Sequence, residues 1–146
     1  MALNKDYKEF IASLNDNKVQ YLVVGGYAVA FHGHPRYTKD IDIWIEPTDE
    51  NICLLLKAID DFGFGSLGFK KEDFSKPDMI VQIGVPPNRI DLLNSIDGLD
   101  FKEAIANKKI ITKDGVTINL VGLDDLRKSK KTSGRPQDLA DLENLQ

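Results

Sequence analysis

The chain opens with an apolar stripe that predicts a helix. Its members recur at positions i, i+3, i+4 and i+7, so a helix places them on one face; they are Tyr7, Phe10, Ile11 and Leu14. A polar run at 15–17 ends this pattern. The apolar run at 21–24, YLVV, then predicts a buried strand. We expect this part of the chain to form a helix followed by a strand of the core.

Two glycines follow this strand and predict a change of direction. Gly25 and Gly26 permit a tight turn with backbone angles that a side chain would oppose. Residues 27–33, YAVAFHG, then predict a short helix that ends at Gly33 and Pro35. The expected order is strand, glycine turn and helix.

Residues 39–46 alternate in polarity, as a strand with one buried face does. One face holds Ile41, Ile43 and Ile45, and the other holds Asp40, Asp42 and Trp44. Thr48 is placed to cap the next helix, whose apolar stripe ends before Gly63. We expect that helix to pack on the isoleucine face of the strand.

The second half of the chain predicts the rest of the sheet. The expected elements are a loop that includes one helical turn at 64–78, strands at 79–84 and 89–93 joined as a hairpin by a Pro-Pro-Asn turn, a helix at 101–111 and a strand at 116–121. Two helices follow, separated at Ser133 and Gly134, and Pro136 suits the first position of the second helix. Its packed side is expected to hold Leu139, Leu142 and Leu145.

This order of elements predicts an α/β (α+β) fold, in which a small mixed β-sheet has helices packed on one side and further helices at the C-terminus. A length of 146 residues, 42% of them hydrophobic, suits one domain spanning residues 1–146. Cys53 is the only cysteine, which excludes an intramolecular disulfide and a cysteine-rich zinc site.

Charge and targeting signals narrow the function classes. The net charge is -4 and the pI is near 5.2, which argues against coating nucleic acid by bulk electrostatics and leaves room for a local contact. The N-terminal residues lack the pattern of a signal peptide, and no segment reaches the roughly 20 apolar residues needed to cross a bilayer. We therefore expect a soluble cytoplasmic protein with no membrane contact.

Three acids carry the candidate chemistry. Asp40 and Asp42 share one strand face, at roughly 6 to 7 Å along the chain. Such a pair repels itself unless a cation lies beside it, and Mg²⁺ prefers a few carboxylates together with water and substrate phosphates. The alternative for the pair alone is an exposed acidic strand face. Asp91, which alternates with Ile90 and Leu92, meets the pair if the two strands are neighbours with matched faces.

The glycine turn and several cations suggest phosphate binding. A helix that begins after Gly26 directs free N–H groups toward the turn, where a phosphate can bind, although such a turn is often only a backbone necessity. Lys130 and Arg135 are the first candidate cations for a triphosphate, followed by Arg36. Each cation has an alternative role. Lys130 could lie on a solvated lysine face of a helix, and Arg135 could pair with Asp138 or Asp141. Arg36 could neutralise the Asp40 and Asp42 pair without contacting a substrate.

Three other side chains near the acids have more than one interpretation. His32 and His34 are separated by Gly33, and this spacing suits a zinc site poorly. We expect His32 to orient its loop through a hydrogen bond instead. Trp44 either stacks on a base or shields the edge of the sheet.

A set of short motifs resembles the nucleotidyltransferase superfamily that includes DNA polymerase β. The motifs are GG at 25–26, HG at 32–33, R-x-T at 36–38, DID at 40–42, the later Asp91, and K-x-x-x-G-R-P-x-D-L-x-D from Lys130 to Asp141. The likeness spans almost the whole chain. It is greatest to small bacterial members, including the nucleotidyltransferase-like proteins of toxin–antitoxin and abortive-infection modules.

The resemblance implies a set of roles for these residues. Asp40 and Asp42 would ligate two Mg²⁺ ions, and Asp91 would ligate the ion that activates the acceptor hydroxyl. The implied nucleotide contacts are Gly25, Gly26, Arg36, Thr38, Lys130 and Arg135. The implied reaction transfers a nucleotidyl group from an NTP to a hydroxyl, on RNA such as tRNA or on a protein, and releases pyrophosphate.

The same resemblance leaves an alternative open. Many active members have serine as the second residue of the turn, where this chain has Gly26, so the fold could instead serve a non-catalytic interaction protein, one component of a toxin–antitoxin pair. The chain is too short for a separate acceptor-binding domain of ordinary size, so a homodimer or a partner protein could complete the site.

Overall fold

A six-stranded mixed sheet forms the centre of the computed structural model, which describes residues 3–34 and 38–145. Its strands are β1 (Tyr21–Val24), β2 (Ile41–Ile45), β3 (Ile80–Ile83), β4 (Ile90–Leu93), β5 (Lys109–Lys113) and β6 (Val116–Leu120). Their order across the sheet is β3-β4-β2-β1-β6-β5. The neighbours β2 and β4 run parallel, as do β1 and β6, and the other neighbouring pairs are antiparallel. The predicted mixed sheet is confirmed.

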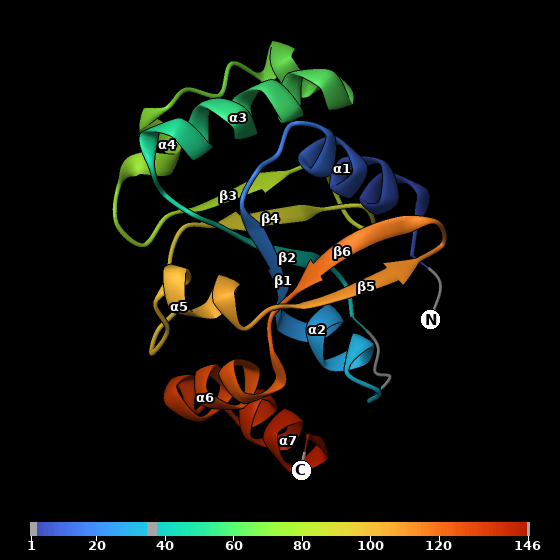
Figure 1. Ribbon diagram of the computed structural model, residues 1–146, viewed down its shortest axis with the longest axis vertical. Coiled ribbons are helices and arrows are strands. Elements are labelled where there is room, and N and C mark those ends of the chain that lie inside the picture. Colours follow the sequence, from blue (N-terminus) through green and yellow to red (C-terminus); the bar gives the residue numbers. More distant parts are fainter. Residues whose placement is uncertain (1–2, 35–37, 146) are drawn as a thin grey trace.

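Helices cover both faces of this sheet. They are α1 (Lys5–Asp16), α2 (Gly25–Phe31), α3 (Asp49–Ile59), α4 (Glu72–Ser75), α5 (Phe101–Ala106), α6 (Leu123–Ser133) and α7 (Pro136–Asn144), with a π-helical turn at Asp60–Phe64 and a 3-10 turn at Gly65–Leu67. In Figure 1, α1 and α3 lie together on one side of the sheet, and α6 and α7 form a pair on the other side. Among the described residues, no helix is long and apolar enough to cross a membrane.

The core lies mainly between the sheet and the first of these helix layers. The apolar stripe of α1 and the isoleucines of β2 are buried, as their periodicity predicts. On the opposite face of β2, Trp44 packs edge-to-face on Phe101 of α5, with ring centroids 5.0 Å apart. Trp44 is only 2% exposed. Its side chain therefore belongs to the core, and its ring is not available to stack on a base.

The expected helix ends are largely confirmed. The Thr48 side chain accepts a hydrogen bond from the Asn51 N–H at the start of α3, and Pro136 is the first residue of α7. The glycine turn is tighter than expected, because α2 begins at Gly25 itself, directly after β1, with φ of +69° at that glycine. That angle is in the left-handed region, where glycine carries no steric cost.

The prediction of a helix over 101–111 is wrong in its second half. The helix α5 ends at Ala106, and residues Lys109–Lys113 form β5, which pairs with β6 along its whole length. The turn between the two strands contains Asp114 and Gly115, both with positive φ. These angles suit a tight hairpin turn. The pairing with β6 supplies hydrogen bonds that outweigh the helical preference of the lysines.

The predicted packed side of α7 is also wrong in part. Leu139 is 48% exposed and Leu142 is half-buried, whereas Leu145 is buried. The residues that α7 turns inward are Asp138 and Asp141. Buried carboxylates require a cation, and Lys130 of the adjacent helix α6 provides one. This ion pairing therefore overrides the apolar pattern.

Candidate active site

The sheet brings the three predicted acids together. Asp42 in β2 and Asp91 in β4 are register partners in adjacent parallel strands, and Asp40 immediately precedes β2 on the same face as Asp42. Register partners in parallel strands direct their side chains to the same face. Asp91 is buried, and Asp40 and Asp42 are half-buried. An acid from a distant part of the chain thus joins the pair.

An arginine that is not among the predicted site residues binds two of these acids. The guanidinium of Arg89 donates from Nε and Nη2 to the two carboxylate oxygens of Asp91, at 2.9 and 3.1 Å, and from Nη2 to Asp40 Oδ2 at 2.6 Å. The alternation of a strand offered a signal, because Arg89 is two residues before Asp91 and so faces the same way. The acid cluster, defined as Asp40, Asp42 and Asp91, therefore has its own internal cation.

Negative charge still exceeds positive charge in the acid cluster. Burial, followed by the neighbouring charges of Asp91 and Asp40, raises the pKa of Asp42 to about 6, against weaker opposing effects of Lys130 and Arg89. Asp40 Oδ1 is buried and, within the described residues, accepts no hydrogen bond. A buried carboxylate oxygen without a partner is costly. The cluster is therefore suited to receive a further positive charge.

The chemistry of these side chains fits Mg²⁺, although the side chains are not gathered around one point. Carboxylate oxygens are the ligands that this hard cation prefers, and the unpaired Asp40 Oδ1 is one of them. Within the described ranges, no three His, Cys, Asp or Glu side chains are arranged to hold a metal ion. The carboxylates of Asp40 and Asp91 instead point to Arg89. The carboxylate donors therefore suit the ion, and Arg89 binds two of the three carboxylates.

Gly25 has a steric reason to lack a side chain. A Cβ atom at this position would collide with the carboxylate of Asp42, and φ is positive as well. The residue beside it, Gly26, is buried in the first turn of α2. The close approach of the Gly25 backbone to Asp42 places the glycine turn directly against the acid cluster. Phosphate binding by the turn remains a prediction.

The structure places some of the other residues that were predicted to lie near the acids. His32 lies with Nε2 2.7 Å from the Val121 carbonyl oxygen, a hydrogen bond that orients the end of α2 as expected. Burial lowers the pKa of His32. Thr38 is half-buried, and Arg36 lies outside the described residues.

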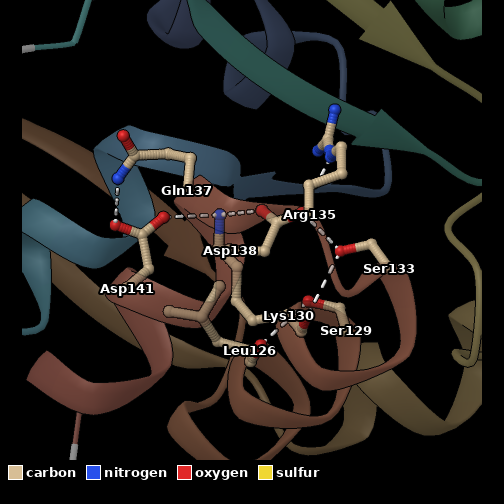
Figure 2. Close-up of polar contacts among 8 residues, drawn as sticks. All are labelled: Leu126, Ser129, Lys130, Ser133, Arg135, Gln137, Asp138 and Asp141. Atoms are coloured by element: carbon tan, nitrogen blue, oxygen red, sulfur yellow. Dashed lines mark hydrogen bonds and ion pairs between the residues drawn. The ribbon is translucent and has the colours of Figure 1, made fainter.

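A second charged group, the C-terminal cluster, joins α6 to α7. It consists of Lys130, Ser133, Arg135, Asp138 and Asp141. Figure 2 shows the Lys130 ammonium between the two carboxylates, at 3.2 Å from Asp138 Oδ1 and 3.0 Å from Asp141 Oδ2. Asp138 Oδ2 also accepts hydrogen bonds from Ser133 Oγ at 2.6 Å and Arg135 Nε at 2.7 Å. The alternative in which Arg135 pairs with Asp138 is thus the observed one, and Lys130 is not on a solvated helix face.

The carboxylates of this second cluster are well neutralised. Burial raises the pKa of Asp138, but the hydrogen bonds from Ser133, Arg135 and Lys130 outweigh it, and the pKa is lowered to about 2. Asp141 is fully buried, and the side-chain amide of Gln137 donates to it at 3.1 Å. The ion pairs of the motif from Lys130 to Asp141 therefore hold α6 and α7 together.

One pocket of about 650 Å³ is lined by Asp42 of the acid cluster and by residues of the C-terminal cluster. Gly25 and Asp42 contribute one wall, and Lys130 and Arg135 contribute another. The remaining wall comes mostly from β3, β4 and the segment after β4: Met79, Ile80, Leu93, Ser95 and Ile96. The side chain of Arg135 is 77% exposed, so its positive charge reaches the open part of the pocket. Acid, cation and apolar surfaces thus share one cavity of a size typical for small ligands.

Comparisons with known proteins identify the family and the fold. Residues 1–146 match the family described as nucleotidyltransferase of unknown function (DUF6036). None of the curated proteins matches the chain. The Thermotoga maritima protein TM1012, assigned as a nucleotidyltransferase, has 18% identity and a TM-score of 0.64, over 92% of this chain and 86% of that one.

Two antibiotic-modifying enzymes also share the fold. The lincosamide adenylyltransferase LnuA, solved with lincomycin, has 17% identity and a TM-score of 0.61, over 99% of this chain and 96% of that one. ANT(2")-Ia, solved with adenylyl-2"-tobramycin, has 10% identity and a TM-score of 0.55, over 94% of this chain and 83% of that one. At these identities the likeness concerns the fold alone.

Proposed function

The chain belongs to the DUF6036 family of nucleotidyltransferases, and we propose that it transfers a nucleotidyl group from an NTP to an acceptor hydroxyl in a Mg²⁺-dependent reaction. The observation that carries this proposal is the register of Asp42 with Asp91, which gathers three acids beside a glycine turn. The pocket that Gly25 and Asp42 line also contains Lys130 and Arg135, whose positive charges suit an anionic substrate. This is the set of charges that a metal-bound triphosphate requires.

Each part of the site has a proposed task. Asp40, Asp42 and Asp91 would hold Mg²⁺, which would lower the pKa of the acceptor hydroxyl and neutralise charge on the phosphates. Gly25 leaves room for the Asp42 carboxylate. Arg135, which is largely exposed, faces the phosphates, and Lys130 adds positive charge from the pocket wall.

The bond changes in the proposed reaction balance without a covalent enzyme intermediate. The acceptor oxygen forms a bond to the α-phosphorus of the NTP, and the bond from that phosphorus to pyrophosphate breaks. The hydroxyl proton is released to water. The protein's contribution is to bind, orient and neutralise charge, since none of these steps requires an enzyme nucleophile.

The proposed acceptors fall into three classes. RNA, including tRNA, and protein are implied by the resemblance to small bacterial nucleotidyltransferases. A small hydroxylated molecule is a third class, because the pocket of about 650 Å³ suits drug-sized ligands. The structure solved with adenylyl-2"-tobramycin shows such an acceptor on a similar fold. A role within a toxin–antitoxin pair and a homodimer that completes the acceptor site are further parts of this proposal.

Transfer of label tests the proposed function directly. The protein is incubated with Mg²⁺ and each α-³²P-labelled NTP in the presence of a fractionated cell extract, and RNA, protein and small molecules are then separated. We expect one fraction to gain label from the α-position and none from γ-labelled NTP, and Asp42→Asn to abolish the signal. Asp91→Asn should reduce turnover more than nucleotide binding, because its proposed task concerns the acceptor hydroxyl.

The alternative, a non-catalytic interaction protein, predicts a different result. In that case no fraction gains label. Titration calorimetry with Mg²⁺ and each NTP would then also show no heat that Asp40→Ala or Asp42→Ala abolishes. These two negative results together would reject the proposed enzymatic activity.

A further inference from the structure

The side chain of Arg89 occupies the carboxylate oxygens that a metal ion would use. It takes both oxygens of Asp91 and one oxygen of Asp40 in a forked arrangement. Two N–H groups of a planar guanidinium match a carboxylate particularly well. The remaining Asp40 oxygen is buried without a hydrogen-bond partner in the described part of the chain. Arg89 therefore pairs with Asp40 and Asp91, and its single positive charge does not balance the three acids of the cluster.

The backbone of Arg89 is held firmly, whereas its side chain is not enclosed. The hydroxyl of Tyr7, a fully buried residue, donates to the Arg89 carbonyl oxygen at 2.8 Å, and the Ile41 N–H donates to the same oxygen at 3.4 Å. The Arg89 side chain is 26% exposed. The guanidinium can therefore leave the carboxylates by rotation of its side chain, while the strand that carries it stays in place.

We propose that Arg89 is an internal counter-cation of the acid cluster, which holds Asp40 and Asp91 in place in the metal-free protein and which a divalent cation displaces. This inference rests on the proposed metal-dependent function. It explains why three acids on one face, Asp42 among them, form no ready metal site within the described residues: two of them are bound to Arg89.

Displacement has a measurable consequence for metal affinity. A divalent cation must compete with Arg89 for Asp40 and Asp91, so Arg89 weakens its binding. Removing the arginine frees the oxygens and makes the cluster more negative. Arg89→Met keeps much of the length and apolar stem of the side chain and lacks the charge. We expect this variant to bind Mn²⁺ about tenfold more tightly, from the usual effect of an adjacent cation on a carboxylate.

The test titrates the full chain with Mn²⁺ and follows the free ion by its EPR signal. Arg127→Met is the matched control, because it removes the same charge from α6, where Arg127 pairs with Asp124 and the Leu145 carbonyl. We expect its Mn²⁺ affinity to equal that of the wild type. Arg89→Lys should bind Mn²⁺ more tightly than the wild type but less tightly than Arg89→Met, since one ammonium cannot bridge two carboxylates as a guanidinium does.

Thermal unfolding provides a second readout. Without metal, Arg89→Met should melt below the wild type because its acids repel one another, and Mn²⁺ should raise its Tm more than it raises that of the wild type. If Arg89→Met and Arg89→Lys are folded by circular dichroism and neither binds Mn²⁺ more tightly than the wild type, the inference is wrong. If Arg89→Met does not fold, the Mn²⁺ affinity of Arg89→Lys relative to the wild type tests the inference by the same criterion.

This result is separable from the test of the proposed function. Label transfer without any tightening in the Arg89 variants would overturn only the role of Arg89. Tighter Mn²⁺ binding without label transfer would support the role of Arg89 and count against the enzymatic activity.

Discussion

The two charged clusters that face the pocket differ in how fully their carboxylates are paired. In the C-terminal cluster, Asp138 accepts from a lysine, an arginine and a serine, and its pKa falls to about 2. In the acid cluster, Arg89 binds only Asp40 and Asp91, and the pKa of Asp42 rises to about 6. Both contain buried acids close to a cation, yet their ionisation is shifted in opposite directions.

This difference separates charge that stabilises the fold from charge that is available for a ligand. A carboxylate whose partners are all within the chain stabilises the packing of the elements it joins, here α6 and α7 (Figure 2). A carboxylate that lacks them destabilises the ligand-free protein, and a bound cation relieves this cost. Variants of the two clusters should therefore differ in whether they change activity or stability.

Asp42→Asn should separate activity from stability most clearly. We expect nucleotidyl transfer to fall roughly 10³-fold, as for the loss of a major electrostatic contact in an active site. The folded pKa of Asp42 lies above its usual 3.8, so ionisation lowers the stability of the fold as the pH rises through about 4 to 6. The uncharged amide of the variant avoids this loss, and its Tm at pH 7 should be equal to or higher than that of the wild type. A large loss of Tm would show that the Asp42 carboxylate stabilises the fold, which contradicts its assignment as charge available for a ligand.

Lys130→Met should affect stability most, in addition to removing a positive charge from the pocket wall. It leaves Asp138 and Asp141 buried without their shared cation, and breaking such a buried pair costs about 3 to 5 kcal/mol. Urea unfolding measures the change. Lys128→Met is the control, because Lys128 is an exposed lysine of the same helix, and we expect it to change the free energy of unfolding by less than about 0.5 kcal/mol.

The Asp138→Asn variant tests the pairing through its dependence on pH. A carboxylate with a lowered folded pKa stabilises the protein above its unfolded pKa, and this contribution is lost as the pH falls toward the folded value. The wild type should exceed Asp138→Asn by about 2 kcal/mol at pH 6. The difference should shrink between pH 4 and pH 2, near the pKa of about 2. A difference that does not depend on pH would show that the hydrogen bonds matter and the charge does not.

The smallest effect is expected on the outer face of α7. Leu139 is 48% exposed and Leu145 is 2% exposed. Leu139→Ala should lower the free energy of unfolding by less than about 0.5 kcal/mol, whereas Leu145→Ala should lower it by about 2 kcal/mol or more. Chemical unfolding compares the two. Equal losses would mean that α7 packs through its leucines, as its sequence pattern suggested, and would weaken the role given to Asp138 and Asp141.

Features that depend on neighbouring residues in the chain were predictable. Apolar spacing predicted α1, alternation predicted β2 and its acidic face, and Thr48 and Pro136 marked helix starts. These are short-range properties, and the backbone periods of 3.6 and 2 residues determine them. The meeting of Asp91 with Asp42 was predicted only on condition that their strands are neighbours with matched faces, and the sheet meets that condition.

Features that depend on a distant partner were not predictable in the same way. Residues 109–113 have the pattern of a helix end until β6 pairs with them, and α7 has the pattern of a leucine-faced helix until Lys130 places its acids inside. The pairing of Arg89 with Asp40 joins residues 49 positions apart. Propensity is a weak local preference, and tertiary hydrogen bonds and ion pairs override it.

The sequence by itself determined which groups this protein offers for the proposed binding of a metal-bound nucleotide: three acids in strand contexts, a glycine turn, and two cations in the tail. Only the tertiary structure decided which of these groups form ion pairs with one another. It gave Lys130 two buried carboxylate partners and left Asp42 with excess negative charge around it. The physical reason is that ionisation depends on burial and on charges within a few ångströms, and the fold sets both.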